Sequence, residues 1–341
     1  MKVFLLALLA LVHTCAALEV AVRVEALEIP GEKLKGNPLG DPMARHAAVL
    51  APRGSSPDEK LPMVYYLPGW GGSCEEYIAA GNGSAYARMV AELAAQGMPL
   101  RIVVVDGRTR WGGSQFLNTP AMGNYADYVA EEVVRVVEKT FALAPGRRLI
   151  AGHSSGGYGA LMLAMQRHAL FAGVVALSPD SDFERTHKGL VEQPAVRGVK
   201  AKEVAAWMPP STAQPANGLV GLICGLCASY APTGKPGQFA WLYDDRGQWQ
   251  PAVWQRWLDA DPLTAVRKNR DAFAPAQRVY LDGAEFDEFK ANLGARAIYE
   301  ALRDRASPVT FYESPGHHSD RLAERFARGL AWALSSKPTG Q

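Results

Sequence analysis

A glycine-flanked serine between a strand-like and a helix-like segment is the feature that most constrains this sequence. The apolar residues 149–151 precede the run Gly-His-Ser-Ser-Gly at 152–156, and a stretch rich in alanine, leucine and methionine follows it. A sharp strand-to-helix turn raises its central serine onto an exposed tip, and it needs glycines where side chains would collide with the crossing strand and helix. The segment therefore predicts a nucleophile elbow with Ser154 at its tip.

Strand-like and helix-like segments alternate along most of the remaining chain. The expected strands span 63–67, 101–105, 148–152, 173–177, 278–281 and 309–312. The expected helices span 84–96, 125–141, 157–168, 291–303 and 319–334. This alternation predicts an α/β fold with a mostly parallel central sheet and helices on both faces. Residues 182–261 interrupt it with proline, glycine and tryptophan, so we expect a lid-like insertion over the carboxyl edge of the sheet.

Composition excludes some partners, and the N-terminus predicts export. The 341 residues are 48% hydrophobic with a formal net charge of +2, and no long basic run provides an electrostatic case for nucleic acid.

Lys2 precedes an apolar stretch at 3–12 and small residues at 16–17. We expect residues 1–17 to be a cleaved signal peptide of a secreted or periplasmic protein, since the stretch is too short for a stable membrane span.

The cysteines give less information. Loss of the signal peptide leaves Cys74, Cys224 and Cys227, an odd number that predicts a free thiol or an intermolecular bond. The pair at 224 and 227 is interpreted as a local disulfide or as two small core residues. The sequence has no second cluster of ligands at metal spacing, so no metal is expected.

A reactive serine needs a base and an acid. Of the seven histidines, only His317 and His318 follow the last expected strand, where this architecture places its base. We expect one of them to be catalytic and the other to be a neighbour or a substrate contact. Between serine and histidine, four acids follow the penultimate strand: Asp282, Glu285, Asp287 and Glu288. Asp287 is the preferred candidate and Asp282 the next.

Backbone amides that stabilise an oxyanion are expected at two positions. One is the amide of Ser155, the residue after the nucleophile, and the other is that of Trp70 in the glycine-rich loop 68–73. Trp111 and Phe116, which follow the second central strand, are interpreted either as substrate-binding residues or as core residues.

These features together resemble the putative-esterase family of α/β-hydrolases, which includes S-formylglutathione hydrolase (esterase D), feruloyl esterases, enterochelin esterases and mycolyltransferases. The residues that carry the resemblance are 34–42 with Arg45, 62–69, 125–141, 152–161 and 316–318. The resemblance implies a single α/β-hydrolase (esterase) domain over 18–341, containing the insertion at about 182–261. It also implies that Ser154 is the nucleophile, Asp287 the acid and His318 the base.

The sequence thus predicts a secreted serine carboxylic-ester hydrolase that works through an acyl-enzyme, without a cofactor, on a small-molecule or carbohydrate-linked ester. An acyltransferase on the same triad and a non-catalytic binding protein of the same fold are the alternatives. Five tryptophans lie in the insertion or at its edge: Trp207, Trp241, Trp249, Trp254 and Trp257. They are expected either to form the floor of a site for a sugar, aryl or lipid group or to pack the insertion.

Overall fold

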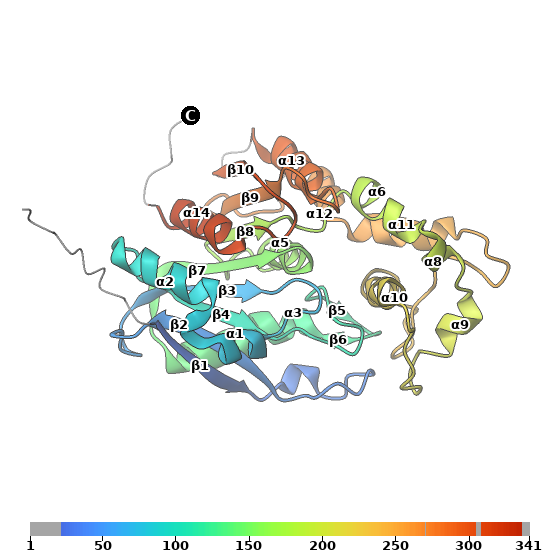
Figure 1. The fold of residues 1–341 in the computed structure, drawn as a ribbon, viewed down its shortest axis with the longest axis horizontal. Coiled ribbons are helices and arrows are strands. Elements are labelled where there is room, and N and C mark those ends of the chain that lie inside the picture. Colours follow the sequence, from blue (N-terminus) through green and yellow to red (C-terminus); the bar gives the residue numbers. More distant parts are fainter. Residues whose placement is uncertain (1–21, 270, 305–307, 336–341) are drawn as a thin grey trace, which may run out of the picture.

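The computed structural model describes residues 22–269, 271–304 and 308–335. In these residues an eight-stranded sheet has the order β1-β2-β4-β3-β7-β8-β9-β10 (Figure 1). Its strands are β1 (Val22–Ile29), β2 (Arg45–Pro52), β3 (Leu61–Leu67), β4 (Arg101–Val105), β7 (Leu143–His153), β8 (Gly173–Leu177), β9 (Arg278–Ala284) and β10 (Val309–Ser314). β1, β2 and β4 pair antiparallel, and the sheet from β4 to β10 is parallel. The expected signal peptide lies outside the described residues.

The parallel strands confirm the expected fold class. β4 and β8 have the bounds that the sequence predicts, and every residue in both strands is buried, which is why they are continuous apolar runs. The sequence analysis did not predict β1 and β2. β1 lies at the edge of the sheet, with charged residues among its apolar ones, and its place depends on antiparallel pairing with β2.

Helices cover both faces of the sheet. The longer ones outside the insertion are α1 (Cys74–Ala80), α2 (Ala85–Ala95), α4 (Val134–Thr140), α5 (Ser155–Gln166), α13 (Ala291–Leu302) and α14 (Leu322–Leu334). α1, α2 and α14 share one hydrophobic core with the sheet, whereas α4, α5 and α13 belong to the core on the other face. The expected helix over 125–141 is built from α3 (Tyr125–Asp127), a π-helical segment (Tyr128–Val133) and α4.

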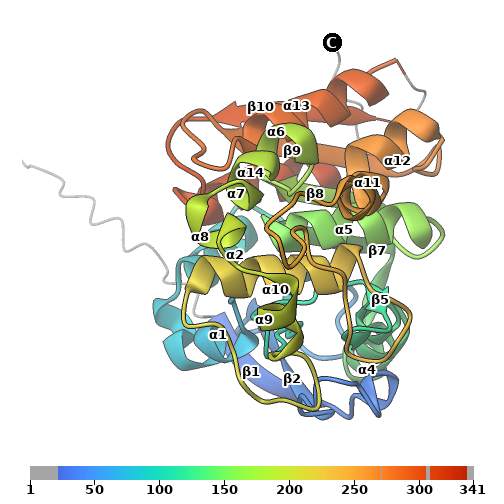
Figure 2. The same ribbon diagram turned by 90° about the vertical axis from the view of Figure 1, so that its right-hand side faces the viewer.

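The insertion between β8 and β9 is helical. Its elements are α6 (Phe183–Thr186), α7 (Lys188–Val191), α8 (Pro194–Arg197), α9 (Ala201–Ala205), α10 (Gly218–Tyr230), α11 (Pro251–Ala260) and α12 (Pro262–Lys268). Figure 1 shows most of them beyond the carboxyl ends of β3 and β7, and Figure 2, which faces that side, shows α10 running across it. The proline, glycine and tryptophan content of residues 182–261 did not predict the longer helices α10 and α11.

Short elements complete the description. They are two 3-10 turns (Glu32–Leu34 and Gly81–Gly83) and the small hairpin of β5 (Asn118–Thr119) and β6 (Gly123–Asn124). No helix among the described residues has the length and apolar character needed to cross a membrane.

The turn between β7 and α5 has the backbone that the sequence predicts. Ser154 has φ 57° and ψ −123°, a conformation that L-residues rarely adopt. A Cβ on Gly152 would lie 2.1 Å from the carbonyl oxygen of Gly156, and a Cβ on Gly156 would lie 1.8 Å from the carbonyl oxygen of Leu67. Backbone atoms, which cannot move aside as a flexible side chain can, occupy the space that either Cβ would need. Glycine is therefore required at both positions.

We expect Gly156→Ala to lower the free energy of unfolding by about 3 kcal/mol or more, because α5 and β3 must move apart to admit one methyl group. Urea unfolding followed by circular dichroism measures this change. Gly218→Ala in the first turn of α10 is the matched control, since nothing lies within 4 Å of its new Cβ. Equal stability of the Gly156 variant and the wild type would contradict the packing described here.

Candidate active site

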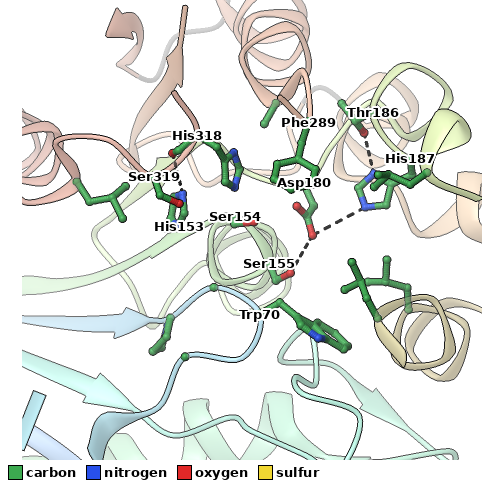
Figure 3. Close-up of a pocket in the computed structure, with 18 of the residues that line it drawn as sticks. Trp70, His153, Ser154, Ser155, Asp180, Thr186, His187, Phe289, His318 and Ser319 are labelled. Atoms are coloured by element: carbon green, nitrogen blue, oxygen red, sulfur yellow. Dashed lines mark hydrogen bonds and ion pairs between the residues drawn. The ribbon is translucent and has the colours of Figure 1, made fainter. Parts of the chain in front are cut away.

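A cavity of about 340 Å³ opens beside Ser154 (Figure 3). Its wall includes the loop after β3 with Trp70, the elbow, the segment from Asp180 through the insertion, the segment after β9 with Phe289, and the loop after β10 with His318. Leu190, Leu222 and Leu226 form an apolar side of the cavity. The insertion therefore supplies part of the wall around the nucleophile candidate.

His318 and Asp287 are joined by a hydrogen bond. The Nδ1 atom of His318 lies 2.7 Å from Oδ2 of Asp287, and both side chains are buried. Burial alone would raise the pKa of Asp287, but the hydrogen bond and charge of His318 outweigh it and hold that pKa below its usual value. Because an ionised carboxylate only accepts, Nδ1 donates, so the ring atom that can accept a proton is Nε2.

His317 occupies a different position from its neighbour. Its side chain is 59% exposed, with Nδ1 3.1 Å from the carbonyl oxygen of Phe286 and 3.2 Å from the Glu288 carboxylate. It is not among the residues that line the cavity. The geometry therefore favours His318 as the base, and His317 does not take the expected position of a substrate contact.

Asp282, the second candidate for the acid, belongs to a buried ion pair. Its Oδ1 lies 2.7 Å from Nε of Arg325, and its Oδ2 accepts a 2.6 Å hydrogen bond from Ser314. Arg325 also donates to the carbonyl oxygen of His318 at 3.0 Å. Asp282 thus supports the loop that carries His318 instead of touching its imidazole.

His153 is a residue of the site that the sequence analysis missed. Its Nε2 lies 3.1 Å from the carbonyl oxygen of His318, and the two rings are 4.6 Å apart between centroids. Burial, followed by the nearby positive charges of His318 and Arg325, lowers the pKa of His153 to about 3. The ring is neutral, and because a carbonyl only accepts, Nε2 carries its proton. No local pattern identifies this role, since it depends on a loop 165 residues away.

Trp70 and Ser155 both line the cavity, as expected for donors to an oxyanion. Among the described residues, neither backbone amide has a protein acceptor. The Trp70 indole holds its loop in place by packing closely against three glycines. A Cβ on Gly112, Gly113 or Gly225 would lie 2.2–2.7 Å from the ring. The loop after β3 is thereby packed against α10 of the insertion.

Trp111 and Phe116 are not substrate contacts in this structure. Both are buried and neither lines the cavity. Trp111 packs edge-on against Phe239, and the Phe116 ring fills the space next to Gly107 and Gly159. Of the two interpretations, this packing supports that of core residues, and it involves segments distant in sequence.

The tryptophans of the insertion pack that segment. None of the five lies among the described residues that line the cavity. Trp254 contacts Trp249 and Trp257, and Lys188 lies 4.2 Å from the Trp249 ring centroid. These contacts support the packing interpretation over that of a substrate floor.

The three described cysteines are free and buried, so the disulfide interpretation of Cys224 and Cys227 is wrong. Both lie in the core on α10, and burial raises the pKa of the Cys224 thiol to about 12. No group of three or more metal-ligating side chains was found within the described ranges.

A second polar cluster, centred on Asp180, also lines the cavity. Oδ2 of Asp180 accepts hydrogen bonds of 3.0 Å from Oγ of Ser155 and from Nε2 of Gln115, and it lies 3.9 Å from Nε2 of His187 (Figure 3). Gln115 has a positive φ of 50°, uncommon for this residue type. Aspartates that directly follow strands are frequent turn formers, so the sequence alone does not indicate this role for Asp180.

The sheet, the elbow and the cavity together define an α/β-hydrolase. Residues 42–326 match the family model described as Putative esterase, so the chain belongs to that family.

Known proteins resemble the chain to different extents. It is 28% identical to the S-formylglutathione hydrolase of Mus musculus over 149 residues, or 40% of this chain and 51% of the mouse protein, so the match spans about half of that relative. The structure of an S-formylglutathione hydrolase from Agrobacterium tumefaciens has a TM-score of 0.59 at 19% identity and covers 93% of this chain and 97% of that one. A ferulic acid esterase has a TM-score of 0.58 at 18% identity, with coverage of 92% and 97%. The structural likenesses show the fold.

The low pKa of His153 predicts a pH effect on stability. The unfolded chain binds this proton with a pKa near 6.5 and the folded chain with one of about 3. Stability is therefore full above about pH 6.5 and is lost as the pH falls toward 3, by about 2 kcal/mol at pH 5. We expect His153→Gln, whose amide keeps a donor for the His318 carbonyl, to remove that loss. Urea unfolding of both proteins at pH 7 and pH 5 measures it, and identical pH dependence would count against a buried neutral His153.

Proposed function

We propose that this esterase works through a triad of Ser154, His318 and Asp287 and a covalent acyl-enzyme. One observation carries the proposal: Ser154 and His318 line the same cavity, and the imidazole of His318 is hydrogen-bonded at 2.7 Å to Asp287. A serine at the tip of an elbow, a base and a carboxylate that orients the base are the parts that nucleophilic acyl transfer needs.

In the first half-reaction, Oγ of Ser154 attacks the ester carbonyl carbon as its proton passes to Nε2 of His318. The amides of Trp70 and Ser155 donate to the oxyanion that forms, and each such donor contributes about 3–4 kcal/mol in comparable enzymes. Asp287 stabilises the imidazolium. Collapse of the tetrahedral intermediate breaks the ester C–O bond, and the departing alkoxide takes the proton from His318.

In the second half-reaction, water attacks the acyl-enzyme. His318 removes a proton from the water, the same amides stabilise the second oxyanion, and Ser154 regains its proton as the acid leaves. This sequence needs no cofactor. The apolar wall of the cavity and the Phe289 ring, 4.8 Å from the His318 ring, favour it by limiting bulk water around the imidazole.

We propose a small-molecule or carbohydrate-linked ester as the substrate, in keeping with a cavity of about 340 Å³. The names of similar proteins, S-formylglutathione hydrolase and ferulic acid esterase, support acyl groups between one carbon and an aromatic acid in size as the range to test.

We also propose that the enzyme is secreted or periplasmic after removal of residues 1–17. N-terminal sequencing of the protein exported by a bacterium that expresses the full-length gene tests this, with Leu18 expected as the first residue. Recovery of the protein in the cytoplasm with Lys2 still present would contradict it.

A fluorophosphonate probe tests the nucleophile. We expect stoichiometric labelling of the wild type and none of Ser154→Ala, because only an activated serine attacks the probe at a useful rate. Intact-mass spectrometry and mapping of the labelled peptide measure the outcome. Ser155→Ala is the matched control, and its labelling at Ser154 should persist. Absence of labelling in folded wild-type protein would favour the non-catalytic alternative.

The adjacent histidines provide a comparison within one loop. We expect His318→Gln to lower kcat/KM for an aryl ester by about 10⁴-fold, because the base is lost, and His317→Gln to change it by less than about threefold. Steady-state kinetics with 4-nitrophenyl acetate, alongside circular dichroism, measures both. The reverse order of effects would transfer the role of base to His317.

A further inference from the structure

Asp180 presents an unused acceptor to the cavity. Its hydrogen bonds from Ser155 and Gln115, and its contact with His187, all involve Oδ2. Among the described residues, Oδ1 accepts no hydrogen bond, although Asp180 lines the cavity. A carboxylate oxygen is a strong hydrogen-bond acceptor. Oδ1 of Asp180 is therefore available to accept a hydrogen bond from a ligand.

His187 presents a second acceptor. The hydroxyl of Thr186 lies 2.9 Å from the carbonyl oxygen of Ser181 and 3.2 Å from that of Asp182, and a carbonyl only accepts, so the hydroxyl hydrogen points to them. The same hydroxyl oxygen, 2.8 Å from Nδ1 of His187, must then accept from it. Burial lowers the pKa of His187, so the ring is neutral and Nε2 has a lone pair instead of a proton.

The rest of the wall does not satisfy these acceptors. Apart from histidines, Asp180 is the one charged side chain among the described residues that line the cavity, and no lysine or arginine is present there. Two acceptors, Oδ1 of Asp180 and Nε2 of His187, therefore lie in a wall with a negative charge. An anionic group would be repelled there, whereas a hydroxyl or ammonium group would supply the missing donor.

The position of Asp180 and His187 relates them to the acyl half of the ester substrate. In Figure 3, His318 lies on one side of Ser154, and His187 lies on the other, with Asp180 between them. The leaving alcohol must face His318, which protonates it, so the acyl group extends away from His318. The amide of Asp180 donates to the carbonyl oxygen of Ser154 at 3.3 Å, which ties the backbone of Asp180 to that of the nucleophile candidate.

We propose that Asp180 and His187 form a specificity site for an acyl group with a hydrogen-bond donor, a hydroxyl or ammonium, near its carbonyl carbon. This inference rests on the proposed function, because it takes Ser154 as the nucleophile and His318 as the base. It deepens that function by naming a substrate class, esters of short hydroxy or amino acids, and by excluding anionic acyl groups.

Pairs of near-isosteric 4-nitrophenyl esters test the proposal. The 3-hydroxybutyrate ester is compared with the 3-methylbutyrate ester, and the 2-hydroxypropanoate with the 2-methylpropanoate, each kcat/KM being divided by the rate of alkaline hydrolysis. We expect the hydroxyl to be preferred over the methyl group by about tenfold or more at one of the two positions. The 3-aminobutyrate ester distinguishes ammonium from hydroxyl, and the hemisuccinate is expected to be a poorer substrate than the 4-methylpentanoate.

Two variants assign the preference to this site. Asp180→Asn places an amide donor or a neutral oxygen where the free carboxylate oxygen lies, and His187→Asn keeps a donor for Thr186 but lacks the Nε2 acceptor. We expect either change to lower the ratio of kcat/KM for the hydroxyl ester to that for the methyl ester toward one. We also expect Asp180→Asn to raise kcat/KM for the hemisuccinate relative to that for the 4-methylpentanoate. Asp259→Asn, an exposed acid on α11 that does not line the cavity, is the matched control and should keep the wild-type ratios.

The outcomes separate this inference from the proposed function. Wild-type protein labelled at Ser154 by the fluorophosphonate but with a ratio near one would overturn the specificity site alone, whereas absent labelling would overturn the proposed function. A high ratio unchanged in both variants would also overturn the inference. So would a donor preference confined to the alcohol side, measured with the butyrate esters of ethylene glycol and propanol. If one variant fails to fold, the other variant and the wild-type ratios decide.

Discussion

The close crossing of α5 over the end of β3 is the contact on which the site depends. The Cα of Gly156 approaches the Leu67 carbonyl so closely that no side chain fits between them. This crossing forces the turn at Ser154 into its positive-φ conformation and brings the amide of Ser155 next to the loop after β3. The nucleophile candidate and the expected oxyanion donor at Ser155 are therefore positioned by a single backbone contact.

A buried ion pair performs the corresponding task for the histidine. Arg325 on α14 bonds to Asp282 at the end of β9 and to the carbonyl oxygen of His318, which also accepts from His153. The loop that carries His318 is thereby connected to β9, to α14 and to the elbow. An unpaired charge in this position would cost several kcal/mol, so the loop has few alternative conformations.

Two pairs of aspartate and histidine, each with its histidine in the cavity wall, differ in which ring nitrogen the protein occupies. Asp287 accepts from Nδ1 of His318 at 2.7 Å and leaves Nε2 free beside Ser154 as a base. In the other pair, Thr186 accepts from Nδ1 of His187, and Nε2 lies 3.9 Å from Asp180, too far for a hydrogen bond. In the proposed mechanism the first pair moves a proton, and in the proposed specificity site the second pair binds a donor. Residue types alone do not distinguish these roles, because the tautomer is set by neighbours.

The sequence by itself determined the elements whose signals are local. Continuous apolar runs predicted the parallel strands, and the glycines around Ser154 predicted the elbow, because backbone sterics depend on adjacent residues. Only the tertiary structure placed His318, and not His317, in the cavity wall, buried Trp111 and Phe116 in the core, and brought Asp180 to His187. Those outcomes depend on contacts between segments far apart in the chain, where burial and hydrogen-bond partners give a side chain its role. No local pattern records them.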